Sequence, residues 1–251
     1  MVQAPQRTAF SGPALIRLLA RLTDVDVPES SQSLSDRLSQ WLGWTDAIAL
    51  SSALNNNPPA VAAGARAFGD AEESEYARAR ASLASAIVGD SVFAAARRRG
   101  SAAPALPHGA PVDAPVDYAV FRQRYLSMQQ SMETGVGNLR GRLRAMLATR
   151  TPAMARLAVV DAVMERALSE RERSLLAAVP GLLAGHFERL RQAEHQTLPD
   201  AEAPEDAAMA APATPGAWLD AFRKDMQSVL LAELDVRLQP VEGLLAALRT
   251  R

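Results

Sequence analysis

Three histidines, His108, His186 and His195, are the only imidazole groups of the chain, and their spacing argues against a metal or acid–base site. His186 and His195 are nine residues apart, so on one helix they would point to opposite sides. The sequence has no His-x-x-x-His or Glu-x-x-His pair to complete a metal site. Only His186 lies near an apolar stripe, and we interpret it as a hydrogen-bonded histidine at a helix boundary.

The stretch TGVGNLRGR (Thr134–Arg142) has the composition of a phosphate-binding loop without its context. Such a loop follows a strand and opens a helix, whereas an apolar helical pattern runs straight through this stretch. Its glycines therefore indicate close helix approach or a flexible point. The sequence contains no Gly-x-Ser-x-Gly, Ser-x-x-Lys or Asp-rich metal loop, and no cysteine. We predict a non-enzymatic protein without a catalytic, metal or cofactor site.

The segment 118–158 is strongly basic. It contains seven arginines against one glutamate, Glu133, for a net charge of +6. One interpretation is a surface for nucleic acid or anionic lipid, and the other is a solvated helix face partly neutralised by the acidic loop 198–216 or by a partner protein. The net charge of −1 for the whole chain favours the second. Candidate contacts for a partner or an anion are Arg122, Arg124, Arg140, Arg142, Arg144 and Arg150.

Two of the three tryptophans, Trp41 and Trp44, flank Gly43 in the stretch LSQWLGWTDAIALSSAL. The spacing predicts a corner between two short helices, with Gly43 as a left-handed C-cap and Thr45 as the next N-cap. Aromatic residues at helical spacing are normally core, so we expect the two rings to be buried over the joint. Trp44 lies one step outside the apolar stripe of the first helix. An aromatic hook for a ligand is the alternative.

These side chains must be positioned by helices, because the composition favours an all-α fold. Hydrophobic residues form 48% of the chain and aromatic residues only 5%, with alanine and leucine supplying most of the apolar content. Strands draw on β-branched and aromatic residues, and the sequence has no alternating run of them. A chain of 251 residues can bury one large core or two smaller ones.

Proline-rich stretches divide the chain. Four prolines in 101–116 predict a Pro/Ala-rich linker between a small N-terminal helical domain, 10–100, and a C-terminal helical bundle, 117–251. An acidic, proline-rich loop is expected at 198–216.

The longest apolar pattern lies in the C-terminal half. Apolar residues recur every three or four positions from Tyr118 to Met146, which predicts a long helix with a coiled-coil-like seam in an antiparallel bundle. Later stripes predict its partner helices. Pro180 should kink or break one of them, and Pro240 should interrupt the last.

Three stretches, GPALIRLLARLTD, SLSDRLSQWLGWTDAIALSSAL and FRQRYLSMQQSMETGVGNLRGRLRAMLA, resemble an uncharacterised proteobacterial family known only as a domain of unknown function. The resemblance extends over nearly the whole chain. It implies a bacterial cytoplasmic protein, with coiled-coil and cell-envelope proteins as neighbours, and it supplies no catalytic residues.

The sequence therefore favours a non-enzymatic helical scaffold or adaptor that binds another helical or coiled-coil protein, or itself. Binding of nucleic acid or an anionic surface through the Arg-rich helix 118–158 is the alternative, and a small ligand beside Trp41 and Trp44 is a third possibility. No stretch is long and apolar enough for a membrane span, and the N-terminus lacks the features of a signal peptide. With the absence of cysteine, these features predict a cytoplasmic protein.

Overall fold

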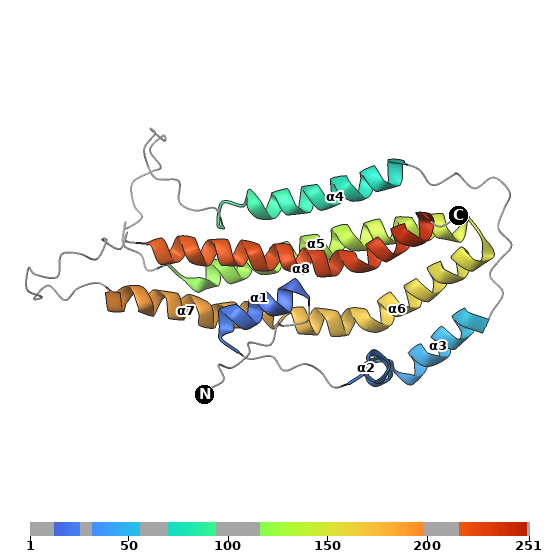
Figure 1. Cartoon of the computed structure of the whole chain (residues 1–251), viewed down its shortest axis with the longest axis horizontal. Coiled ribbons are helices and arrows are strands. Elements are labelled where there is room, and N and C mark those ends of the chain that lie inside the picture. The colour runs from blue at the N-terminus through green and yellow to red at the C-terminus, as the bar shows by residue number, and fades with distance from the viewer. Residues whose placement is uncertain (1–12, 26–31, 56–69, 94–115, 198–215, 250–251) are drawn as a thin grey trace, which may run out of the picture.

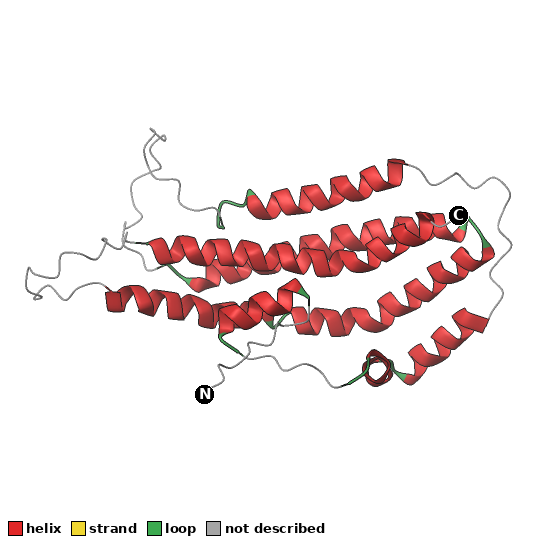
Figure 2. Ribbon diagram, in the orientation of Figure 1, coloured by secondary structure: helices red, strands yellow, loops and turns green. Residues whose placement is uncertain are grey.

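The computed structural model describes residues 13–25, 32–55, 70–93, 116–197 and 216–249, and all regular structure within them is helical (Figure 2). This confirms the predicted all-α fold. None of the described helices has the length and apolar character needed to cross a membrane. In chain order the helices are α1 (Ala14–Thr23), α2 (Leu34–Trp41), α3 (Trp44–Asn55), α4 (Asp70–Val88), α5 (Tyr118–Ala148), α6 (Pro152–Leu176), α7 (Val179–Thr197) and α8 (Ala217–Arg249).

Short polar side chains begin several of these helices. Ser33 and Asp36 form a capping box at the start of α2, in which the Asp36 amide donates to the Ser33 hydroxyl at 3.1 Å and the Ser33 amide donates to the Asp36 carboxylate at 3.3 Å. Asp117 caps α5 and Thr151 caps α6, where Pro152 supplies the first helical residue. Because α6 is capped so soon after α5 ends, the two long helices join through 149–151 alone.

Helices α5 and α8 lie at the centre of the bundle and run in the same direction (Figure 1). Phe121 meets Phe222 early along both helices, and Tyr125 bonds to Glu233 further along both. Figure 1 shows α4, α6 and α7 running the opposite way. The bundle is therefore not antiparallel throughout, because its two longest helices are parallel to each other.

One continuous hydrophobic core follows this central pair. The apolar pattern predicted from Tyr118 to Met146 lies on a single helix and faces the core. Its buried apolar and aromatic residues are Phe121, Tyr125, Met128, Met132, Val136, Leu139, Leu143 and Leu147. Helix α8 adds Phe222, Met226, Val229, Leu230, Leu234, Leu238, Val241, Leu244, Leu245 and Leu248.

An aromatic cluster closes one end of this core around Phe187 of α7. The Phe187 ring centroid lies 5.0 Å from those of Trp218 and Phe222 and 5.5 Å from that of Tyr118. The contacts to Trp218 and Phe222 are edge-to-face, the arrangement that aromatic quadrupoles favour. The Tyr118 hydroxyl also donates to the carbonyl of Pro180, which ties the start of α5 to the start of α7.

The two prolines that were expected to disturb helices behave differently. Pro180 lies in the first turn of α7, after α6 has ended, so the predicted break occurs there. Helix α8 instead continues through Pro240, and the predicted interruption is wrong. Proline has no amide hydrogen, so the Val236 carbonyl lacks its helical donor. The buried neighbours Leu238 and Val241 pack in the core on both sides of Pro240, and this packing keeps the helix continuous.

Within the described residues, α1 to α4 do not form the separate N-terminal domain expected over 10–100. Helix α1 packs on α7 and α8, α3 packs on α6, and α4 packs on α5 and α8. Leu15, Leu19 and Leu22 of α1 belong to the same core as the C-terminal helices. A short amphipathic helix gains most by lying on a large apolar surface, which the bundle offers and its short neighbours do not. The predicted linker 101–116 and loop 198–216 lie almost entirely outside the described residues.

Helix α4 is attached by both apolar and polar contacts, with Tyr76, Leu83 and Ala84 half-buried against the core. Among its described side chains only Ile87 is buried. At the surface, the Tyr76 hydroxyl donates to Glu242 at 2.5 Å and Arg80 donates to Asp235 at 2.8 Å. Exposed pairs of this kind contribute about 0–1 kcal/mol each, so α4 is held more weakly than the central helices.

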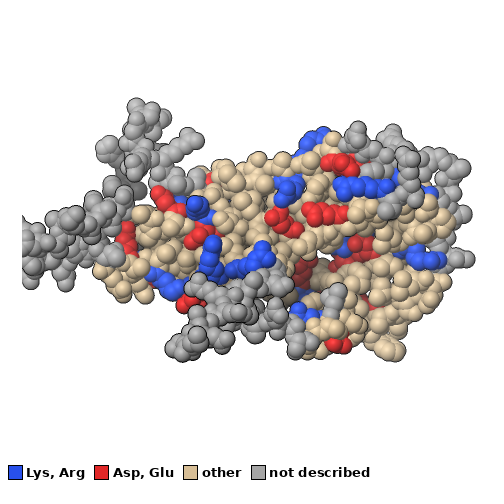
Figure 3. Space-filling view, viewed as in Figure 1, with Lys and Arg blue, Asp and Glu red and all other residues tan. Residues whose placement is uncertain are grey.

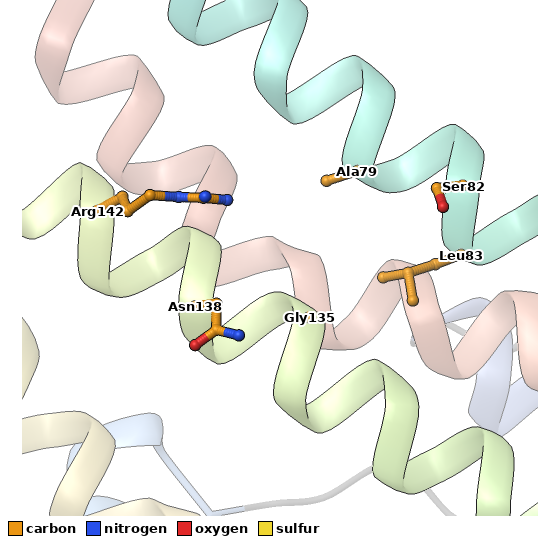
Figure 4. A pocket seen from close by; sticks show the side chains of 6 residues that line it. All are labelled: Ala79, Ser82, Leu83, Gly135, Asn138 and Arg142. Atoms are coloured by element: carbon orange, nitrogen blue, oxygen red, sulfur yellow. The ribbon is translucent and has the colours of Figure 1, made fainter.

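A gap of about 410 Å³ remains between α4 and α5 (Figure 4). Small residues leave it open, and its lining consists of Ala79, Ser82, Leu83, Gly135, Asn138 and Arg142. A Cβ at Gly135 would lie 3.4 Å from a Leu83 methyl carbon. Gly135 therefore marks the close helix approach that was one interpretation of the glycine pattern, and a phosphate loop is excluded because the whole stretch lies inside α5.

Replacing Phe187 with alanine should lower the free energy of unfolding by about 3–5 kcal/mol, since it removes a buried ring from the centre of the aromatic cluster. Leu182→Ala on the same helix is the control, because the Leu182 side chain is 42% exposed. Urea denaturation followed by circular dichroism measures both. Equal losses in the two variants would contradict the packing described here.

Candidate functional site

Two arginines of α5 form shielded ion pairs with α6. Arg140 donates through Nε and Nη2 to the two carboxylate oxygens of Asp161, at 2.9 and 2.7 Å. Arg144 donates to Asp161 at 3.1 Å and also bonds to Glu165. The Arg140 and Asp161 side chains are only 13% and 12% exposed. A two-pronged bond of this kind is strong and directional, so it fixes α6 against α5.

Two further candidate arginines are paired with the region around α4. Arg124 donates to Asp90 at 2.6 Å, and Asp90 lies just beyond the end of α4 with its carboxylate almost fully buried. Arg142 meets Glu75 at 2.7 Å, with both side chains well exposed. These carboxylates occupy the same guanidinium groups that a bound anion would need.

The last two arginines named as candidate contacts for a partner or an anion, Arg122 and Arg150, lie apart from the ion pairs described above. Arg122 is exposed near the start of α5, and Arg150 is half-buried in the turn after it. On the face drawn in Figure 3, acidic and basic side chains are interspersed and form no single-sign patch. The arginines are thus neutralised largely by carboxylates of α6 and of the α4 region. The sequence pattern had indicated neutralisation but not these partners.

A buried polar network at the centre of the bundle was missed by the sequence interpretation. Glu233 of α8 is fully buried and accepts hydrogen bonds from the Tyr125 hydroxyl at 2.8 Å, from Gln129 Nε2 at 3.0 and 3.1 Å, and from Arg237 Nε at 2.9 Å. Burial, and after it the negative charge of Glu233, raises the pKa of Tyr125 far above its usual range. Gln129 also donates to the carbonyl of Leu176, the last residue of α6.

The network is closed and leaves no carboxylate oxygen of Glu233 without a donor. Arg237, which neutralises Glu233 from one turn away, reaches Glu172 of α6 with its other nitrogen at 3.3 Å. Such an arrangement fixes the positions of the helices that contribute to it. A signal was present in the sequence, because Glu233 and Arg237 continue the apolar stripe through Met226 and Leu230 at helical spacing.

His186 has a structural role of the expected kind, although it lies inside α7 and not at its boundary. Its Nε2 lies 2.8 Å from a carboxylate oxygen of Asp225, and the imidazole is 11% exposed. His195 is exposed in the last turn of α7, and His108 lies outside the described residues. Among the residues that the structure places, no group of three or more His, Asp or Glu side chains could hold a metal ion.

The corner between α2 and α3 differs from the prediction. Trp44, the first residue of α3, is 81% exposed, so the expectation of two buried rings is wrong for this residue. Trp41 is half-buried, and the Arg171 guanidinium lies over its ring at 5.6 Å from the centroid. Helices α2 and α3 rest on α6, and this leaves the outer side of the corner without cover.

The capping of this corner also differs. Leu42 ends α2 in an extended conformation. Gly43 precedes α3, and its amide donates to Asp46 at 3.3 Å. Gly43 is not left-handed, since the positive φ values among the described residues belong to Asp24 and Gly216. Thr45 lies within the first turn of α3 and is not its N-cap.

Trp44 belongs to an exposed apolar face of α3. Ile48 follows it one turn later and is 51% exposed, and Leu54 near the end of the helix is 52% exposed. The opposite side of α3 packs on α6, with Ala53 buried. We call Trp44, Ile48 and Leu54 the α3 face.

Trp41 lines a cleft of about 720 Å³ between α6 and α8. Both helices pack along α5, which forms the floor of the cleft, and Trp41 with Arg171 lies at its edge. Figure 3 shows the surface hollowed between α8 and α6. The corner therefore carries one tryptophan toward a cleft and the other toward solvent.

Comparison with known proteins gives a family for the chain. Residues 1–250 match the family described as "Protein of unknown function (DUF3348)", and the chain belongs to this family. The resemblance to a family of unknown function is thereby confirmed. No curated protein and no solved structure matches the chain.

Arg140→Ala should lower the free energy of unfolding by about 2 kcal/mol, because it leaves the shielded Asp161 without its two-pronged partner. Arg142→Ala should change it by less than about 0.5 kcal/mol, because that pair is exposed. Urea denaturation compares the two. A larger loss for Arg142→Ala would show that exposure does not separate these arginines.

Alanine substitutions of the two tryptophans should differ in their effect on the free energy of unfolding. Trp44→Ala should leave the free energy of unfolding within about 0.5 kcal/mol of the original, since an exposed ring has little to lose. Trp41→Ala should cost about 1–2 kcal/mol through lost burial and the lost Arg171 contact. Thermal melts of both variants measure this. Equal destabilisation by both tryptophan variants would mean that Trp44 is covered in solution.

Proposed function

We propose that this member of the DUF3348 family is a non-enzymatic helical scaffold or adaptor that binds another helical protein through the α3 face. The observation that carries the proposal is the exposure of Trp44, Ile48 and Leu54 on one short helix. Tryptophan is enriched among residues that dominate binding energy at protein interfaces, and leaving it in water gains nothing for folding.

The support of α3 suits it to this task. The side of the helix that packs on α6 fixes its position, and the opposite side remains available. Trp44 and Ile48 are neighbours at i and i+4, the spacing at which an amphipathic partner helix places its own apolar residues. A rigid helix that presents a few large apolar side chains loses little conformational entropy on binding.

The buried polar groups support a non-enzymatic role. Glu233 is saturated with donors inside the core, and His186 is paired with Asp225. Neither group is among the residues that line the α6–α8 cleft, and the three glutamates that do line it each pair with an arginine. Binding of nucleic acid through 118–158 receives less support, because Arg124, Arg140, Arg142 and Arg144 already have carboxylate partners.

The proposal includes a cytoplasmic location, with which the cysteine-free sequence is consistent. The partner is a helical or coiled-coil protein, or a second copy of this chain.

Substituting Ile48 with aspartate tests the α3 face. We expect the amount of partner captured by the tagged full chain from the source organism to fall at least about tenfold, because the substitution buries a charge in the interface. Val120→Asp is the matched control, since Val120 is an exposed aliphatic residue on α5, 55% accessible. Light scattering of the purified chains measures self-association with the same variants.

Circular dichroism verifies that both variants remain folded. Partners captured equally well by the Ile48→Asp and Val120→Asp chains would contradict the assignment of the α3 face. A chain that stays monomeric and captures no partner at all would contradict the adaptor proposal itself.

A further inference from the structure

We propose that the cleft between α6 and α8 binds a small amphipathic anion, a molecule with an apolar body and one acidic group. This ligand site is separate from the α3 face and does not depend on the adaptor role. Its evidence is the apolar lining, the open floor and one arginine at the edge of the cleft.

Four helices contribute residues to the lining of the cleft. Helix α5 forms the floor, α6 and α8 form the walls, and α2 contributes its last residue at one edge. The large apolar residues of the lining are Trp41, Val136, Met164, Leu168, Leu175, Val236 and Pro240. Apolar surfaces from four different helices therefore face one space, which suits the apolar body of a ligand.

The size of the cleft favours a small molecule over a partner helix. Its volume of about 720 Å³ falls in the usual range of small-ligand sites. The floor extends along α5 from Glu133 to Arg140, which is about 10 Å at the helical rise, or two turns. The Arg237–Glu172 pair bridges α8 and α6 at 3.3 Å and limits the cleft there. A docked helix would need a longer groove.

The residues at the floor and the α8 wall leave space for a ligand in the cleft. A Cβ at Gly137 would have no neighbour within 4 Å, so the floor is open at this point. On the α8 wall, Val236 and Pro240 add apolar surface to the cleft. The structure therefore offers room above α5 and an apolar wall beside it.

Arg171 gives the site its preference for an acid. Four arginines and three glutamates line the cleft. Each glutamate pairs with a different lining arginine: Glu165 with Arg140 at 3.7 Å, Glu172 with Arg237 at 3.3 Å, and Glu133 with Arg173 at 3.4 Å. Within the described residues, Arg171 has a contact with the Trp41 ring but no carboxylate partner. Its guanidinium can therefore pair with an acidic group while the apolar body lies deeper in the cleft.

Filling the floor tests the site. The probe is 1-anilinonaphthalene-8-sulfonate, whose fluorescence rises on entering an apolar site and which carries one sulfonate. We expect one molecule to bind the full chain, and Gly137→Leu to weaken binding at least about tenfold by occupying the cleft. Leucine at this helical position should not impair folding, because glycine is the poorer helix former. Gly181→Leu is the matched control, since Gly181 is also helical and also has open space around it.

The charge is tested with Arg171→Gln. This variant should bind the sulfonate probe about two- to fivefold more weakly, the effect expected of one exposed charge. It should bind the uncharged analogue N-phenyl-1-naphthylamine as well as the original chain does. Trp44→Ala should bind both probes normally, which separates the cleft from the α3 face.

The source of the acid is tested by competition. Free dodecanoate should displace the probe, and vesicles of phosphatidylglycerol should not. Displacement by vesicles alone, equal binding by Gly137→Leu and Gly181→Leu, or no binding by the original chain would overturn the proposal. An Arg171→Gln chain that binds both probes unchanged would overturn the acidic group in particular.

Discussion

The buried carboxylate of Glu233 constrains the rest of the bundle. An ionised carboxylate removed from water costs several kcal/mol unless hydrogen bonds and an opposite charge compensate it. Tyr125 and Gln129 of α5 and Arg237 of α8 provide that compensation together. Moving α8 along α5 by one turn, about 5.4 Å, would leave the charge without its α5 donors. The parallel register of the two central helices is thus fixed by polar contacts within a core whose apolar residues alone would tolerate several alignments.

The same register determines where α6 lies and therefore what the surface offers. Gln129 also donates to the carbonyl of Leu176 at the end of α6, and Arg140 holds Asp161 in its first half. Both anchors tie α6 to α5 and not to α8, so a cleft remains between α6 and α8. Because α2 and α3 rest on α6, their corner follows its position. One tryptophan of that corner then reaches the edge of the cleft, and the other is left facing water.

The sequence predicted the helices better than the contacts between them. The apolar pattern from Tyr118 to Met146 identified α5 and its buried side, since helical periodicity depends only on local spacing. Whether an apolar residue outside such a pattern is covered depends on distant helices, and this is why Trp44 was misplaced. The carboxylates that pair with α5 lie on other helices, so composition indicated that the arginines were neutralised without identifying Asp161 or Glu75. Glu233 was not predicted as a buried residue, because the donors on α5 that allow its burial are distant in sequence.

Arginine pairs of unequal exposure divide the molecule into firmly and weakly held parts. The forked Arg140–Asp161 pair is shielded and lies between α5 and α6, where the low dielectric strengthens it. The pairs that attach α4 through Arg80 and Arg142 are exposed, and water and salt screen them. Helix α6 is therefore among the best-anchored elements outside the central pair. Since α3 packs on α6, its exposed apolar side stands on a rigid base, and a partner that binds there need not first order the surface it meets.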